Sequence, residues 1–208
     1  MDFSEALADG EAAVLALPIG SLWWCRAMQQ LFVLPQQETS DSSESHEQRM
    51  ARLIELFSRA RPSPDALTAY AAASAYLISY TAHLADRDHA FAFLNFLEHI
   101  AVVARTTDLL LHGWTAYAQG SFCHALEADP AVALDHAQTS IQAFERAGAQ
   151  QGLLQALTLA GQALAALGQL AEAEDALRRA LSLAHQLRDR ALASLAQAHL
   201  AYVLSLRS

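Results

Sequence analysis

Apolar residues recur every three or four positions along this chain, and no other feature of the sequence constrains its fold as much. That spacing places them on one face of an α-helix, whereas a half-buried strand needs strict alternation. Pro, Gly and Asp lie at the breaks between the apolar stretches, where they can end one helix and begin the next. The predicted helices cover residues 4–17, 21–34, 47–60, 65–84, 87–104, 107–127, 130–147, 150–167, 170–187 and 190–206.

Several breaks between these helices carry recognisable chemistry. Asp129 precedes Pro130, so a capping carboxylate stands before a residue whose missing N–H costs nothing in the first helical turn. Gly148 suits the left-handed conformation that commonly ends a helix. Ser21 can cap the second helix, whose Trp23-Trp24 pair we expect to anchor the first helical hairpin.

Residues 35–46 differ from the rest, because they are rich in serine and acidic residues and their central part has no apolar side chain. Such a segment cannot contribute to a core, so we predict a mobile loop within a helical hairpin. Its serines are candidate phosphorylation sites, and a plain solvated linker is the simpler alternative. No other change of composition divides the chain, so we predict a single helical repeat domain over residues 1–208.

The composition limits the classes of molecule that this chain is expected to bind. The formal net charge is −9, the chain has no lysine, and its arginines are scattered. Nucleic acids and anionic membranes need a concentrated cationic surface, so neither is an expected partner. The N-terminus lacks the pattern of a signal peptide, and polar residues interrupt the apolar runs well short of a bilayer span. We therefore expect a cytoplasmic protein.

The C-terminal half repeats itself with a period of about 40 residues. A small pair, Ala160-Gly161, recurs as Gly120-Ser121, the positions 40 residues later hold Leu200-Ala201, and Gly168 marks a turn between two helices. Small residues let antiparallel helices approach closely, while bulky ones fill the gaps between neighbours. The other positions of this repeat are Leu157, Leu164, Ala173, Leu177 and Ala180.

This pattern resembles the tetratricopeptide repeat, well over residues 107–208 and only in general terms over residues 1–106. The run from Ala143 to Gly148 also resembles the longer variant found in bacterial serine/threonine kinases and in large ATPase or transcription regulators of the MalT type. Ser121 departs from the usual glycine, and no proline closes a repeat. The resemblance implies an all-α fold, an α-α superhelix or solenoid of antiparallel helix pairs with about ten helices.

The phase of the repeats makes helix 4–17 a second helix without its first, and helix 190–206 a first helix without its second. The last helix also presents apolar residues such as Leu195 and Leu204 where a terminal unit needs a polar face. We therefore expect a fragment of a larger protein. The alternative is an open C-terminal helix covered by a partner or by a second copy of the chain.

In the resembling arrays the first helix of each pair lines the concave face and meets the ligand. Counting in steps of 40 residues assigns the ligand-contacting positions of those arrays to uncharged side chains in this sequence. Such side chains suit an amphipathic helix or an extended peptide with apolar anchors. In the alternative interpretation Phe122 and Tyr202 merely pack within the array. The candidate partner-binding residues are Thr115, Phe122, Gln155, Thr158, Gln162 and Tyr202, with Ala118, Leu195 and Ala198 at the remaining positions.

Residues able to carry chemistry are sparse. His83, Asp86, Asp88 and His89 surround a helix–helix turn and resemble a cation site, but a capping role for Asp86 and solvated neighbours explain them more simply. The two cysteines, Cys25 and Cys123, are expected to be buried free thiols. We find no catalytic motif and expect no cofactor or metal.

These observations favour a non-catalytic scaffold or regulatory module of a bacterial signalling protein, with a protein or peptide as its partner. The alternative is a module of a transcription regulator that senses a small molecule or a signalling peptide. Because the functional part of this expectation depends on a fold-level resemblance, it requires support from the site itself.

Overall fold

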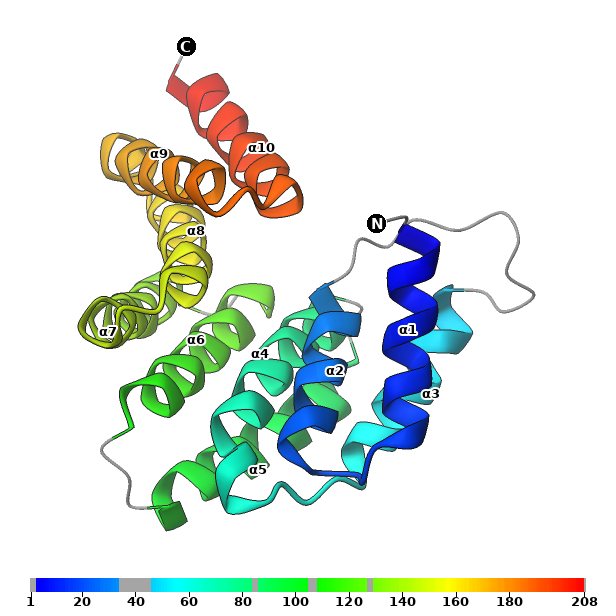
Figure 1. The fold of residues 1–208 in the computed structure, drawn as a ribbon. Coiled ribbons are helices and arrows are strands. Elements are labelled where there is room, and N and C mark those ends of the chain that lie inside the picture. Colours follow the sequence, from blue (N-terminus) through cyan, green and yellow to red (C-terminus); the bar gives the residue numbers. More distant parts are fainter. Residues whose placement is uncertain (1–2, 34–45, 84–85, 105–107, 127–128, 208) are drawn as a thin grey trace. The chain divides into compact units, whose positions relative to one another are not determined.

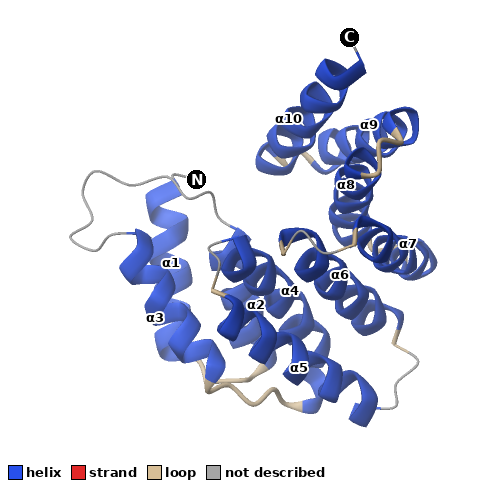
Figure 2. Cartoon of the chain, turned by 180° about the vertical axis from the view of Figure 1, so that it is seen from behind, coloured by secondary structure: helices blue, strands red, loops and turns tan. Residues whose placement is uncertain are grey.

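The computed structural model describes residues 3–33, 46–83, 86–104, 108–126 and 129–207, and the regular elements in these ranges are all helices (Figure 2). The all-α prediction is confirmed, and most helix bounds lie within two residues of the predicted ones. No helix in these ranges combines the length and apolar character needed to cross a bilayer. The elements are α1 (Phe3–Ala16), α2 (Leu22–Val33), α3 (His46–Ser58), the 3₁₀ turn η1 (Pro64–Ala66), α4 (Leu67–His83), α5 (Arg87–Ala104), α6 (Leu109–Ala125), α7 (Pro130–Ala147), α8 (Gln150–Ala166), α9 (Leu170–Leu187) and α10 (Arg190–Arg207).

Contacts divide the chain into two compact units, Met1–Leu77 and Ile78–Ser208, and the boundary falls within α4. A single domain over residues 1–208 stays a prediction, and so does the loop at 35–46, which lies outside the described residues except for His46 at the start of α3.

Three stacked rings form the core of the first unit. Phe57 lies between Trp24, at 6.0 Å between ring centroids, and Tyr70, at 4.6 Å, and the planes are within 13° of parallel. Trp24 therefore anchors the packing of α2 on α3, and its predicted role in the hairpin of α1 and α2 stays a prediction. The same expectation for Trp23 is wrong, because this side chain is 62% exposed and lies beneath the guanidinium of Arg26.

The second unit contains the 40-residue repeat. Helices α6 to α10 each pack against the next in chain order, and α8 also packs against α6 and α10 (Figure 1). We call α6, α8 and α10 the first-helix layer, since each is the first helix of a repeat. The helices that follow α6 and α8, namely α7 and α9, begin at equivalent positions of successive repeats, Pro130 and Leu170.

The turns that connect the repeats show the same period. Gly148 ends α7 with a left-handed backbone (φ 68°), as predicted, and Arg188 adopts the same conformation after α9 (φ 57°). The backbone N–H of Ala149 donates to the carbonyl of Phe144 at 2.9 Å, and that of Asp189 donates to Ala184 at 3.0 Å. The corresponding turns of two successive repeats are therefore closed by equivalent hydrogen bonds.

Small residues allow close helix packing in this unit. An added Cβ at Gly161 would lie 2.5 Å from Leu177, which agrees with the role predicted for the small pair in α8. A second close approach surrounds Phe144, whose ring lies within 2.7 Å of an added Cβ at both Gly113 and Gly152. Phe144 is fully buried, so one large side chain of α7 occupies the space that two glycines leave on α6 and α8.

Candidate binding site in the first-helix layer

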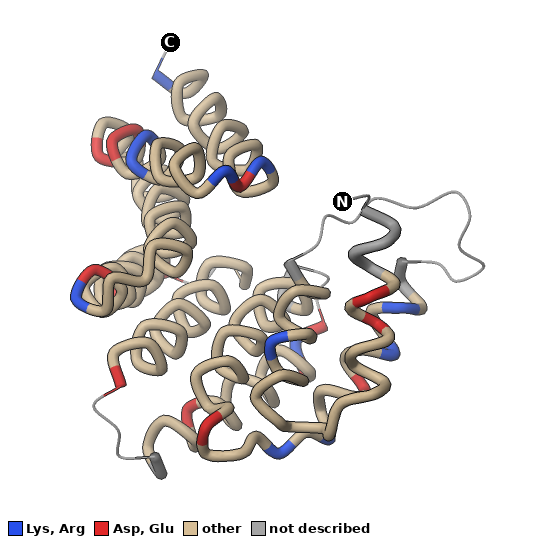
Figure 3. The backbone as a smooth tube through the Cα atoms, viewed as in Figure 1, with Lys and Arg blue, Asp and Glu red and all other residues tan. Residues whose placement is uncertain are grey.

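The first-helix layer is almost free of formal charge. Neither α6 nor α8 contains an Asp, Glu, Lys or Arg residue, and α10 has arginines at its two ends alone (Figure 3). The eight charged residues of α7 and α9 contrast with this layer. They are Asp135, Glu145, Arg146, Glu172, Glu174, Asp175, Arg178 and Arg179.

Two adjoining cavities lie along this layer, and His124, Gln162 and His199 line both of them. The first, which we call the polar cavity, has a volume of about 280 Å³. The second, which we call the apolar cavity, has a volume of about 290 Å³. The polar cavity is further lined by Ser79, Tyr117, Ser121, Gln155, Thr158, Leu159 and Leu195. The apolar cavity is further lined by Gly161, Ala165, Ala166, Leu177, Tyr202 and Val203.

Hydrogen bonds between neighbouring helices hold the polar side chains of these cavities. The hydroxyl of Tyr117 on α6 donates to Oε1 of Gln155 on α8, at 3.3 Å. Nε2 of Gln162 on α8 lies 2.7 Å from Nε2 of His199 on α10. If the amide nitrogen donates, the imidazole accepts and carries its own proton on Nδ1. The first-helix layer is thus connected by polar contacts as well as by packing.

Half of the polar residues that line the polar cavity are well buried, and the other half are partly exposed. Gln155, Thr158 and Ser121 are each 4% exposed, and Tyr117 is 7% exposed. Burial raises the pKa of the Tyr117 phenol, and a hydrogen bond with Ser121 lowers it in part. The phenol therefore stays protonated at neutral pH, and it can both donate and accept a hydrogen bond.

The structure brings together four of the six predicted partner-binding residues. Gln155, Thr158 and Gln162 line the polar cavity, and Gln162 and Tyr202 line the apolar one. Tyr202 is 59% exposed, so it is open to a ligand. Their role in binding stays a prediction.

The other two predicted residues line neither cavity. Thr115 is buried, and its hydroxyl donates to the carbonyl of Leu111 at 2.8 Å. Phe122 is half-buried, and its ring centroid lies 6.4 Å from that of Phe91 on α5. Packing within the array, the alternative considered for Phe122, agrees with this contact.

Sequence reasoning missed the residues that complete the polar cavity. The counterparts of Tyr117 and Ser121 in α8, 40 residues later, are packing residues. The repeat therefore predicted a packing role, and no ligand contact, for Tyr117 and Ser121. His199 carries no motif of its own, and Ser79 comes from α4, outside the clear repeats. The sequence does carry one signal for this cavity, because uncharged polar side chains are concentrated on helices that lack formal charges.

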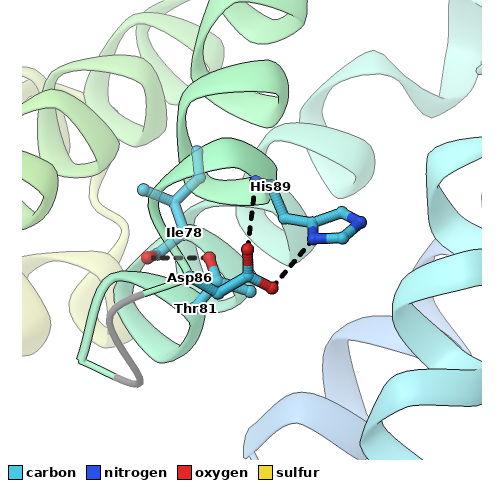
Figure 4. Close-up of polar contacts among 4 residues, drawn as sticks. All are labelled: Ile78, Thr81, Asp86 and His89. Carbon is cyan, nitrogen blue, oxygen red and sulfur yellow. Dashed lines mark hydrogen bonds and ion pairs between the residues drawn. The ribbon is translucent and has the colours of Figure 1, made fainter.

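The turn between α4 and α5 was the best candidate cation site. Both carboxylate oxygens of Asp86 contact His89: Oδ1 accepts from the backbone N–H at 3.3 Å, and Oδ2 lies 2.8 Å from Nδ1 (Figure 4). Asp86 thus caps α5, as the simpler interpretation predicts. The side chain of His83 lies outside the described residues. Among the described residues there is no group of three or more metal-ligating side chains.

The two thiols differ in burial. Cys25 is fully buried, and burial, with a smaller contribution from Asp65, raises its pKa to about 12. Cys123 is half-buried, and burial raises its pKa as well. Neither environment stabilises a thiolate, which a nucleophilic cysteine needs.

No protein-family model matches the sequence, and a search of curated proteins finds no match. The resemblance to tetratricopeptide repeats therefore depends on the residues of the C-terminal half. Membership of that family stays a prediction, whereas the all-helical class of the fold is shown.

Proposed function

We propose that this protein is a non-catalytic scaffold or regulatory module of a signalling protein, and that it binds a protein or peptide segment along its first-helix layer. The observation that carries this proposal is the pair of cavities on helices that have almost no formal charge. The resemblance to repeats of bacterial signalling proteins supports the same function.

A peptide segment matches the chemistry of this layer. Its backbone offers neutral N–H and C=O groups, which the hydroxyl, amide and imidazole groups of the polar cavity can satisfy. An apolar side chain of the same segment would enter the apolar cavity beside Leu177 and Val203. Peptide-binding grooves commonly combine such backbone contacts with pockets for individual side chains.

Sensing of a small molecule is the second candidate. The polar cavity gathers several buried polar groups, and a few convergent polar groups in a concave site are typical of small-molecule pockets. Its volume of about 280 Å³ suits a small ligand. Thermal unfolding against a metabolite library separates the candidates, because a ligand of the folded state raises the melting temperature as its concentration increases.

Selection of random dodecapeptides on the full chain tests the proposed function. We expect selected peptides to bind the wild-type protein in fluorescence anisotropy. Binding should weaken by about tenfold or more, or ~1.4 kcal/mol, with Tyr202→Ala or Gln162→Ala. Arg179→Ala and Gln142→Ala, at exposed positions on α9 and α7, are the matched controls and should leave binding unchanged. Equal binding by all four variants would contradict a site in the first-helix layer.

A further inference from the structure

We infer that the polar and apolar cavities form one two-part subsite, which takes a neutral carboxamide-type group together with a branched apolar side chain and rejects the corresponding carboxylate. This inference rests on the proposed function and names the chemistry that the first-helix layer selects. The three residues shared by the cavities, His124, Gln162 and His199, place the two halves side by side.

The first reason is the missing counter-charge. The lining of the polar cavity consists of hydroxyls, one phenol, two carboxamides, two imidazoles and two leucines, and none of these described residues is Asp, Glu, Lys or Arg. A carboxylate that leaves water for such a site loses its hydration without gaining an ionic partner, which is costly. A neutral amide loses far less and recovers it through hydrogen bonds.

The second reason is the balance of donors and acceptors in the polar cavity. The hydroxyl of Thr158 donates its proton to the carbonyl of Leu154 at 3.0 Å, and its oxygen retains lone pairs that accept. A carboxamide has an NH₂ group that donates to such an oxygen, and a carbonyl oxygen that accepts. An ionised carboxylate accepts alone, so it cannot donate to this oxygen.

The third reason is the composition of the apolar cavity. Leu177, Val203 and two alanines, Ala165 and Ala166, supply aliphatic surface, and Tyr202 adds an exposed aromatic ring. A volume of about 290 Å³ is sufficient for a leucine-sized group. A ligand that spans both halves therefore presents a neutral polar group a few bonds from a branched apolar one.

Protonation of an imidazole would give this subsite a positive charge. The titratable groups that line it are Tyr117 and His124 on α6 and His199 and Tyr202 on α10, while α8, α9 and α4 contribute glutamines, hydroxyls and aliphatic groups. The comparison is therefore made at about pH 8, above the ~6.5 of a histidine side chain in model peptides. Selection against a carboxylate is tested most cleanly under these conditions.

The experiment compares two probes of nearly identical shape that each carry a single polar group, 4-methylpentanamide and the 4-methylpentanoate anion. Each is titrated into the full chain labelled in its histidines, and the imidazole resonances of His124 and His199 are followed by NMR at about pH 8. We expect saturable shifts at both histidines with the amide, and an affinity about tenfold or more above that of the anion, or ~1.4 kcal/mol.

Gln162→Leu should abolish the shift of His124 on titration, because it removes the amide that lies between the cavities while preserving side-chain size. Gln142→Leu, at an exposed position on α7, is the control and should leave the titration unchanged. Thr158→Val is a second variant, and should reduce the preference for the amide over the anion. Unchanged circular dichroism spectra establish that each variant is folded.

Equal affinity for the two probes, tighter binding of the anion, or no saturable shift with either probe would overturn this inference. The proposed function fails separately, when selected peptides do not bind or bind independently of the first-helix layer. Peptides that bind this layer but tolerate Glu in place of each Gln or Asn would support the function while contradicting the subsite.

Discussion

At the scale of single residues, the contact of Phe144 with two glycines determines how closely three helices approach. The ring packs edge-to-face on Trp114 at 5.0 Å between centroids, and its other neighbours include the backbone at Gly113 and Gly152. At the equivalent position of the next repeat, Ala184 packs with Leu154 and Leu192 instead. In one repeat a large side chain fills the space beside small residues, and in the next a small side chain lies beside large ones. The sequence repeat therefore does not reveal this contact.

Gly152→Ala should destabilise the protein even though alanine favours helix. The new Cβ would lie 2.6 Å from the Phe144 ring, and overpacking of this kind costs about 1–3 kcal/mol, against a gain of ~0.5–1 kcal/mol in helix propensity. In a Phe144→Leu background the ring atoms are absent, so the same substitution should cost less. Urea unfolding of the four proteins measures this coupling, and strict additivity would contradict the packing described.

Cys25 predicts a loss of stability in alkali. Its pKa in the folded state is about 12 against an ordinary value of 9.0, so the unfolded chain loses its thiol proton first as the pH rises. The stabilisation is complete below pH 9 and falls between pH 9 and 12, by about 1 kcal/mol from pH 9 to 10. Urea unfolding at these two pH values measures the difference. Cys25→Ala should show a smaller difference, and an equal one would mean that the thiol does not contribute.

At the scale of elements, the helices and turns follow from local sequence. Asp129 accepts a hydrogen bond from the backbone N–H of Ala131 at 2.9 Å, as its place before Pro130 predicts. Gly148 has the left-handed conformation expected of it. The left-handed conformation of Arg188 was not predicted, because arginine has no preference for positive φ. The closing hydrogen bonds of the turn set this conformation instead.

Arg188→Gly should therefore stabilise the protein. Glycine adopts φ 57° without the cost that a side chain imposes, so we expect a gain of ~0.5–1 kcal/mol. Gln186→Gly, at an exposed position in the last turn of α9, is the matched control and should cost ~0.5–1 kcal/mol instead. Melting temperatures measured by circular dichroism show whether each substitution stabilises or destabilises the protein. Destabilisation by Arg188→Gly would refute the left-handed conformation of this residue.

Glu174 connects the last turn of α10 to α9. Its side chain is 8% exposed and forms ion pairs with Arg178 on its own helix and with Arg207 on α10. Glu174→Gln keeps the shape but removes the charge that both guanidinium groups contact. We expect faster hydrogen–deuterium exchange over the last turns of α10. The control Asp175→Asn, at an exposed position, should leave exchange unchanged. Unaltered exchange in both variants would mean that packing alone holds α10.

At the scale of the whole molecule, the sequence predicts the class of fold better than it predicts the site. Helical periodicity and the 40-residue repeat are properties of many residues together, so they tolerate local exceptions. The cavities depend on a few side chains from helices distant in sequence, such as Ser79, Tyr117 and His199. The lack of charge on the first-helix layer is visible in sequence, but which polar groups meet there depends on helix packing.

The most direct test of the central claim, that the uncharged first-helix layer binds a partner segment, is a map of backbone amide shifts. The full chain, labelled with ¹⁵N, is titrated with a peptide obtained by selection. We predict that the largest shifts cluster on α6, α8 and α10 around Gln155, Gln162 and Tyr202. Shifts confined to the charged helices α7 and α9, or to residues 3–33 and 46–77, would contradict it.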